Sequence, residues 1–334
     1  RRPRAPPRLP ARVTTAAWEY PTVAELRAAA DHLRAVAPPT PLVECTPLSR
    51  LTGVPVWLKC EQFQPIGAFK VRGAWTAVGR LSPEARSRGI VTHSSGNHGQ
   101  AVAFTSKQLG LRAVIVMPET APLVKVNAVR SQGAEVVFVP PVATARSAKA
   151  DELAQTEGLT LVPPYDDPNV ILGQATCGLE ILDANPEIGT ILTPIGGGGL
   201  LAGTACAVSA LRPTVRLVGV EPTGAPKLSA ALAAGAPTPI AEARSIADGL
   251  LPLSVGRLTW QYIAPVVREA VPVTDEEIAT AMKLLFWECG LRVEPSGAVP
   301  VAALQSGKFR PTSPTALVLT GGNVDPARFH ELVG

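Results

Sequence analysis

The 334-residue sequence predicts an α/β protein in which parallel sheets are covered by helices on both faces. Short apolar runs such as 113–117 and 135–139 alternate with longer segments whose apolar residues recur at helical spacing. Hydrophobic residues make up 46% of the chain and charged residues only 17%, so a buried core can form. The length exceeds that of a usual single core, so we expect one large or two medium domains.

The predicted elements alternate along the chain. An amphipathic helix over 23–36 comes first and ends at the prolines that begin with Pro38. Strands are then predicted at 56–60, 89–93, 113–117, 135–139, 190–193, 215–220 and 316–320, and helices at 70–81, 98–109, 123–131, 146–155 and 275–289. The last helix has the clearest start, because Thr274 and Glu277 have the spacing of a capping box.

The order of these elements suggests how the domains are arranged. The compact block 81–165 predicts a small αβ domain inserted into a larger one formed by 14–80 and 166–334. Residues 1–13 are rich in proline and arginine and predict a flexible tail. Prolines interrupt that tail, so it lacks the apolar core of a secretory signal. No apolar run reaches the roughly 20 residues needed to span a bilayer.

Charge and cysteine usage exclude several function classes. The net charge of +4 comes largely from the tail, where no aromatic residues are interleaved, so we expect neither nucleic acid nor a membrane as a partner. The five cysteines are widely spaced without a Cys-x-x-Cys pair, which is typical of reduced thiols in a cytoplasmic protein. With only four scattered histidines, a zinc site is not expected.

A lysine stands where a predicted strand is followed by a helix, in the segment Gly67–Gly73. The chain has eight lysines against 23 arginines, so an amine at this junction is notable. The amine of Lys70 can react covalently with a carbonyl group, which is a standard nucleophilic use of lysine. The alternative is a solvated lysine at a helix start.

A run of four glycines, Gly196, Gly197, Gly198 and Gly199, follows a predicted strand and opens a helix. Glycines let the backbone approach a ligand closely, and a helix N-terminus attracts phosphate. The spacing Gly197-x-Gly199-x-x-Ala202, with Glu221 about twenty residues further on, also fits a relaxed dinucleotide fingerprint. An NAD-dependent oxidoreductase is therefore a distant alternative, beside a turn that binds nothing.

Two further loops separate these hypotheses. Ser94–Gly99 combines hydroxyls, an amide and helix-start N–H groups, which suits a carboxylate better than an adenine ring. Thr320–Asn323 is a second loop with a hydroxyl and glycines. A phosphorylated aldehyde bound to lysine, such as pyridoxal 5′-phosphate, would use all four segments, whereas a dehydrogenase has no evident need for them.

With these segments and Val293–Ala298, the chain resembles the fold-type II pyridoxal-phosphate enzymes of the threonine dehydratase, serine dehydratase and serine racemase group, over about residues 20 to 328. The resemblance implies a tryptophan synthase β-like fold, two parallel-sheet αβ domains with the cofactor between them, and a homodimer.

The resemblance also implies a role for each site residue. Lys70 would hold the cofactor covalently and then remove the substrate α-proton, and a nearby cation and desolvation would lower its pKa. The other cofactor-binding residues would be Phe69, Asn97, Gly196, Gly197, Gly198, Gly199, Leu200, Glu294 and Thr320. The substrate would be held by Ser94, Ser95, Asn97 and His98, although His98 alone is more typical of a packed or capping histidine.

The implied reaction is deamination of an L-β-hydroxy amino acid by elimination of water, giving 2-oxobutyrate and ammonia from L-threonine or pyruvate and ammonia from L-serine. The neutral hydroxyl of Thr320 facing the ring nitrogen makes the ring a weaker electron sink, which favours elimination. Ser95 keeps serine racemase open as an alternative, because a serine there offers a proton on the face opposite the lysine. A specialised dehydratase of another β-hydroxy amino acid is also open.

Two departures from relatives lead to expectations. Members that bind a divalent cation pair a glutamate with an aspartate shortly afterwards, but here Lys227 follows Glu221 at that place. An ammonium repels a cation and could pair with Glu221, so we expect no metal site and weak or absent magnesium dependence. The sequence also ends soon after Asn323, so we expect no C-terminal regulatory domain.

Overall fold

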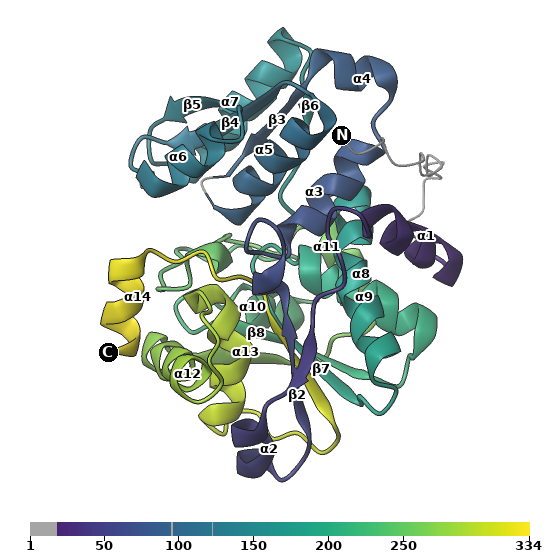
Figure 1. Cartoon of the computed structure of the whole chain (residues 1–334), viewed down its shortest axis with the longest axis vertical. Coiled ribbons are helices and arrows are strands. Elements are labelled where there is room, and N and C mark those ends of the chain that lie inside the picture. Colours follow the sequence, from purple (N-terminus) through teal and green to yellow (C-terminus); the bar gives the residue numbers. More distant parts are fainter. Residues whose placement is uncertain (1–18, 95, 122) are drawn as a thin grey trace.

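The computed structural model describes residues 19–94, 96–121 and 123–334; the predicted tail and Ser95 lie outside the described residues. Two sheets form the framework, one of six strands in the order β1-β2-β10-β7-β8-β9 and one of four in the order β5-β4-β3-β6 (Figure 1). The larger sheet contains β1 (Leu42–Glu44), β2 (Val56–Cys60), β7 (Thr190–Pro194), β8 (Arg216–Pro222), β9 (Ala270–Val273) and β10 (Thr315–Leu319). Its pairs are parallel except for β1, which pairs antiparallel with β2 and was not predicted.

Helices cover both faces of the larger sheet, which gives three layers. One face packs against α1 (Val23–Leu33), α8 (Pro168–Ala184), α9 (Gly199–Leu211) and α11 (Arg257–Ile263). The other face packs against α2 (Thr46–Thr52), α12 (Asp275–Trp287), α13 (Pro295–Gln305) and α14 (Pro326–Val333). The short helix α10 (Lys227–Ala234) follows β8, and single 3-10 turns lie at Glu61–Phe63 (η1) and Asp248–Leu250 (η2).

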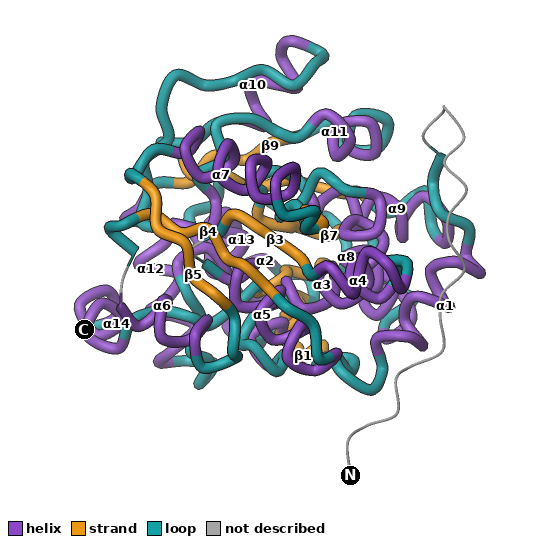
Figure 2. The backbone as a smooth tube through the Cα atoms, turned by 90° about the horizontal axis from the view of Figure 1, so that it is seen from above, coloured by secondary structure: helices purple, strands orange, loops and turns teal. Residues whose placement is uncertain are grey.

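The smaller sheet is parallel throughout and contains β3 (Ile90–His93), β4 (Ala113–Pro118), β5 (Glu135–Val139) and β6 (Thr160–Leu161). Helices α5 (Asn97–Leu109) and α6 (Leu123–Arg130) cover one face, and α7 (Ala143–Thr156) covers the other (Figure 2). The short α4 (Pro83–Arg88) precedes β3. All four strands fall inside the block 81–165, and its status as a separate domain stays a prediction.

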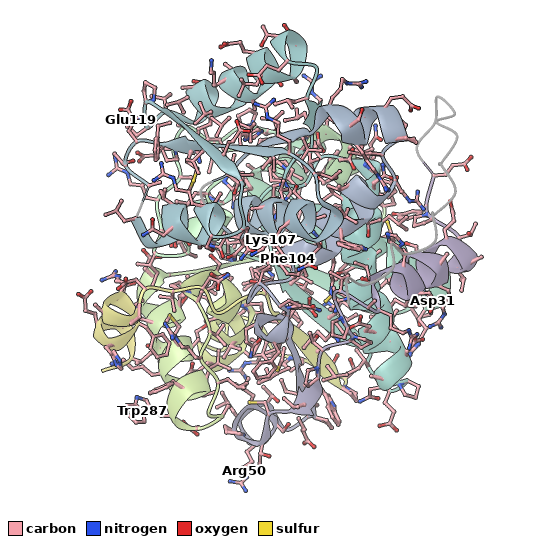
Figure 3. The ribbon with its side chains drawn as sticks, turned by 45° about the horizontal axis from the view of Figure 1, so that its top comes forward. Asp31, Arg50, Phe104, Lys107, Glu119 and Trp287 are labelled. Atoms are coloured by element: carbon pink, nitrogen blue, oxygen red, sulfur yellow. The ribbon has the colours of Figure 1, made fainter. Side chains whose placement is uncertain are left out.

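Helix α3 (Lys70–Gly79) joins the two halves, because it packs against both α5 and α8. Phe104 on α5 lies where the halves meet (Figure 3). Phe104 packs against a small apolar cluster that includes Val71 and Trp75 of α3. The lysine predicted at a strand-to-helix junction therefore lies at the boundary between the two sheets.

Most predicted elements are present, and the strands at 56–60 and 135–139 have the predicted bounds. The capping box is confirmed, since the backbone N–H of Glu277 donates to Thr274 Oγ1 and the Glu277 carboxylate accepts from the backbone N–H of Thr274. All five cysteines are free, with the Sγ atoms of Cys45 and Cys289 3.5 Å apart. Among the described residues, no helix is both long and apolar enough to cross a membrane.

Candidate active site

Lys70 is positioned by two loops that pair with each other. The backbone N–H of Phe69 donates to the carbonyl of Thr320 at 3.0 Å, and the N–H of Gly322 donates to the carbonyl of Gly67 at 2.9 Å. Gly67 has a φ of 70°, and a Cβ there would lie 2.5 Å from the amide oxygen of Asn323. Glycine is therefore required at position 67, and the loop after β10 fixes the start of α3.

The amine of Lys70 is partly buried beneath a backbone carbonyl. Its Nζ donates to the carbonyl of Pro164 at 2.7 Å and lies 5.1 Å from the centre of the Phe69 ring. Burial lowers the pKa of Lys70 to about 8. The prediction that a neighbouring cation assists this shift was wrong for the part of the chain that the structure describes, where desolvation is the cause. About a tenth of the amine is thus neutral at pH 7, a far larger fraction than for an exposed lysine, and this form can act as a nucleophile or base.

The glycine run forms the turn between β7 and α9. Gly198 has a φ of 99°, and the carbonyl of Gly197 is fixed by the Thr259 hydroxyl at 2.8 Å and by the N–H of Gly256 at 3.0 Å. Among the described residues, no acceptor bonds the backbone N–H groups of positions 196 to 201. These consecutive donors lead into the N-terminus of α9, and Leu200 is its second residue. Such an arrangement binds anions and fits a phosphate group.

Asn97, at the start of α5, bridges the two halves of the molecule. Its amide nitrogen donates to Glu294 Oε1 at 2.7 Å, and its amide oxygen accepts from Asn323 Nδ2 at 2.8 Å. The same nitrogen of Asn323 also bonds the carbonyl of Ile66 at 2.8 Å. Burial, followed by the charge of Asp248, raises the pKa of Glu294 to about 8. Glu294 is therefore mostly a neutral carboxyl near neutral pH.

The remaining predicted residues lie around this network. His98 is buried, and its Nε2 donates to the carbonyl of Val162 at 3.0 Å, which fixes the tautomer because a carbonyl only accepts. Burial, with a smaller effect from Lys70, lowers the pKa of His98 to about 3, so the ring is neutral. This geometry is that of a packed histidine, and its contact with substrate stays a prediction. The hydroxyl of Ser94 accepts from the N–H of Gly96 at 3.2 Å. Thr320 is buried, and its carbonyl accepts a hydrogen bond from the backbone N–H of Phe69. Its hydroxyl bonds no described residue.

Sequence reasoning missed the segment that joins β6 to α8. Pro164 holds Lys70, and the ring of Tyr165 packs so closely on the glycine run that a Cβ on Gly197 would lie 2.3 Å from it. The carboxylate of Asp166 accepts from the N–H groups of Leu258 and Thr259 at 2.9 and 3.0 Å, at the start of α11. The Pro-Pro-Tyr-Asp-Asp stretch before a helix marks a turn and an N-cap but carries no catalytic signature.

The expected pairing of Lys227 with Glu221 is not made directly. The Nζ of Lys227 donates to the carbonyl of Ile195 at 3.1 Å. The two oxygens of Glu221 instead accept from the backbone N–H groups of Leu228 and Ser229, and from the Ser229 hydroxyl. The carboxylate caps α10, because a helix N-terminus supplies free N–H groups that a carboxylate satisfies.

Residues 34–321 match the family described as pyridoxal-phosphate dependent enzymes. The chain belongs to this family. An L-threonine ammonia-lyase of Geobacter sulfurreducens is 40% identical over 301 residues, which cover 90% of this chain and 75% of that protein. Serine racemase of Homo sapiens is 40% identical over 295 residues, 86% of each chain. The structure of maize serine racemase matches with a TM-score of 0.90 at 35% identity, covering 94% of this chain and 97% of the other.

Family membership confirms two predictions, the fold-type II architecture and the cofactor pyridoxal 5′-phosphate. It overturns the interpretation of the glycine run as a dinucleotide-binding site. The geometry fits this cofactor. The unbonded N–H groups of 196 to 201 suit its phosphate, and the amine of Lys70, with its lowered pKa, suits its aldehyde.

Proposed function

We propose that the protein deaminates L-β-hydroxy amino acids by β-elimination of water, acting on L-threonine, L-serine or both. The observation that carries the proposal is the Lys70 amine, whose pKa is lowered to about 8 and which is fixed between the loops of Thr320 and Pro164. A relative that spans 90% of this chain bears the name L-threonine ammonia-lyase.

Each step has a residue suited to it. Bound pyridoxal 5′-phosphate supplies an electron-accepting ring that stabilises negative charge on the substrate α-carbon. Lys70 anchors the aldehyde and removes the α-proton, since its amine loses its own proton readily. Residues 196 to 201 hold the phosphate through backbone N–H groups. Asn97, which bonds Glu294 and Asn323, is assigned as the donor to a ring substituent, and these two bonds support the assignment by fixing its side chain.

Elimination is favoured over reactions that need a long-lived carbanion. Thr320, which we place beside the ring nitrogen, carries a hydroxyl and no charge, so it does not enforce a protonated ring. The weaker electron sink favours rapid loss of the β-hydroxyl. The substrate carboxylate is assigned to Ser94 and Ser95 ahead of α5 and to His98 in its first turn, of which Ser95 is outside the described residues.

Serine racemase is the second candidate, because a relative of that name is 40% identical and the maize enzyme of that name matches with a TM-score of 0.90. The predicted role of Ser95, a proton donor on the face opposite Lys70, is what racemisation requires. A Ser95→Ala variant that loses D-serine formation but keeps pyruvate release would assign racemisation to this serine as a second activity.

A substrate screen tests the proposal. The purified, cofactor-loaded protein is given L-threonine, L-serine, threo-3-hydroxyaspartate and bulkier β-hydroxy amino acids, and 2-oxo acid, ammonia and D-serine are measured. We expect rapid 2-oxobutyrate or pyruvate release that is absent in Lys70→Ala. No release from any of them, with the visible absorbance of the bound cofactor intact, would refute the proposed substrate class while leaving the cofactor assignment standing.

A homodimer and a cytoplasmic location are proposed with this function, on the family resemblance and the free thiols. Light scattering on the purified protein measures the first. Fractionation of the source cells measures the second.

A further inference from the structure

A buried ammonium group, that of Lys227, bonds the backbone just before the glycine run, and the proposed reaction does not use it. Lys227 is one of the largest fully buried side chains, with 0% of its surface exposed, and begins α10. A buried lysine without a close carboxylate is costly, because transfer of the charge out of water is not compensated by a direct pair. Among the described residues, no carboxylate lies within 4 Å of its Nζ.

The hydrogen bond that this ammonium makes within the described residues connects it to the anion-binding turn. Its Nζ donates to the carbonyl of Ile195, and that carbonyl belongs to the same peptide group as the N–H of Gly196. Gly196 is the first of the consecutive residues whose N–H groups bond no described acceptor. A cation on the oxygen of a peptide group polarises it and makes its N–H a stronger donor.

Glu221, the carboxylate whose charge acts on Lys227, is itself bonded to other groups and leaves much of this positive charge uncompensated. Glu221 is fully buried, but its oxygens are engaged with Leu228 and Ser229 at the start of α10. Burial lowers the pKa of Lys227 to about 8, with a smaller opposing effect from Glu221. A dianionic phosphate at the glycine run would supply the charge that the site lacks.

We propose that Lys227 is a built-in cation for the phosphate of the cofactor, acting from behind the glycine run. It does so through the Ile195–Gly196 peptide group and through its charge. The proposal rests on the family's cofactor and not on the proposed substrate.

The test compares pyridoxal 5′-phosphate with pyridoxal, which lacks the phosphate. Both can react with Lys70, so the ratio of their dissociation constants isolates the phosphate contribution. In Lys227→Met we expect the affinity of the apoprotein for pyridoxal 5′-phosphate to fall about tenfold or more, as for loss of a nearby charge in partly buried surroundings, with pyridoxal affinity unchanged. The inhibition constant of inorganic phosphate against cofactor binding should also rise in Lys227→Met.

Two further variants make the result decisive. Lys227→Gln keeps a hydrogen-bond donor without the charge, and we expect it to resemble Lys227→Met. Lys59→Met removes another buried lysine, which bonds Thr40 and Glu180, and should leave the ratio unchanged whatever it does to stability. An unchanged ratio in Lys227→Met, equal losses for both ligands, or full recovery in Lys227→Gln would each overturn the proposal.

Discussion

Replacing Arg72 with methionine should strongly destabilise the fold at the helix that carries Lys70. Arg72 is fully buried, and each of its five N–H groups has an acceptor. Its Nε and Nη2 bond Glu61 at 2.7 Å each, and its Nη1 and Nη2 bond Glu180 at 2.6 and 2.8 Å. The fifth bond goes to the hydroxyl of Thr176 at 3.0 Å.

The expected cost follows from the charge left behind. Glu61 is fully buried, and removing one partner of a buried ion pair costs about 3–5 kcal/mol, because the other charge remains desolvated. At roughly 2–4 °C per kcal/mol for a large domain, the melting temperature should fall by about 10 °C. Arg112→Met is the matched control, since Arg112 also bonds two carboxylates, Glu135 and Glu157, but its side chain is 43% exposed. That variant should lose less than about 1 kcal/mol per pair.

Urea and thermal unfolding at several pH values measure both variants. Burial alone raises the pKa of Glu61, but the charge and hydrogen bonds of Arg72, with Lys59 and Thr40, outweigh it and lower the pKa overall. A depressed carboxyl pKa stabilises the fold above the ordinary value near 4 and loses this effect in more acid solution. The gap between wild type and Arg72→Met should therefore narrow below about pH 4. A loss no larger than that of Arg112→Met would refute the reasoning.

Three further predictions concern the site. The rate of borohydride-reducible cofactor attachment should rise with pH through about 8 and then level off, because only the neutral amine of Lys70 reacts; a flat profile contradicts this. Glu294→Gln should match wild type in cofactor affinity near neutral pH, because the pKa of the buried carboxyl is raised to about 8 and the group is mostly neutral there. In thermal melts the stability of this variant relative to wild type should increase as pH rises toward 8, because the wild-type carboxyl ionises more readily in the unfolded chain. A large loss of cofactor affinity contradicts this prediction. Lys125→Ala removes the 2.5 Å ion pair that joins α6 to Asp248 across the two halves. The KM of this variant should rise about two- to fivefold, and the rise should be smaller at high salt. Equal kinetics in Lys125→Ala and in the control Lys149→Ala would refute this prediction.

The parts of the site that the sequence predicts are those in which residue identity alone carries the geometry. Four glycines after a strand indicate a close backbone approach, and the structure places them at the start of α9. The lysine at the strand-to-helix junction starts α3 as expected. In contrast, α8 was missed although it has 17 residues, because most of its residues are buried and it has no polar stripe to give an amphipathic pattern. Tyr165 and Pro164 act through backbone position and shape, which no motif records.

Which charged side chains pair depends on where they lie in the folded structure and not on their distance in the sequence. The electrostatics of the site could therefore not be predicted from the sequence. Glu221 and Lys227 are six residues apart, yet each bonds backbone groups instead of the other. Arg72 and Glu180 are 108 residues apart and make a partly buried pair. Because Glu61 and Glu180 accept four of the five N–H groups of Arg72, its charge is compensated where it lies. Burial is the cause of the lowered pKa of Lys70, two residues before Arg72 on α3, so this shift follows from the loops that enclose the amine.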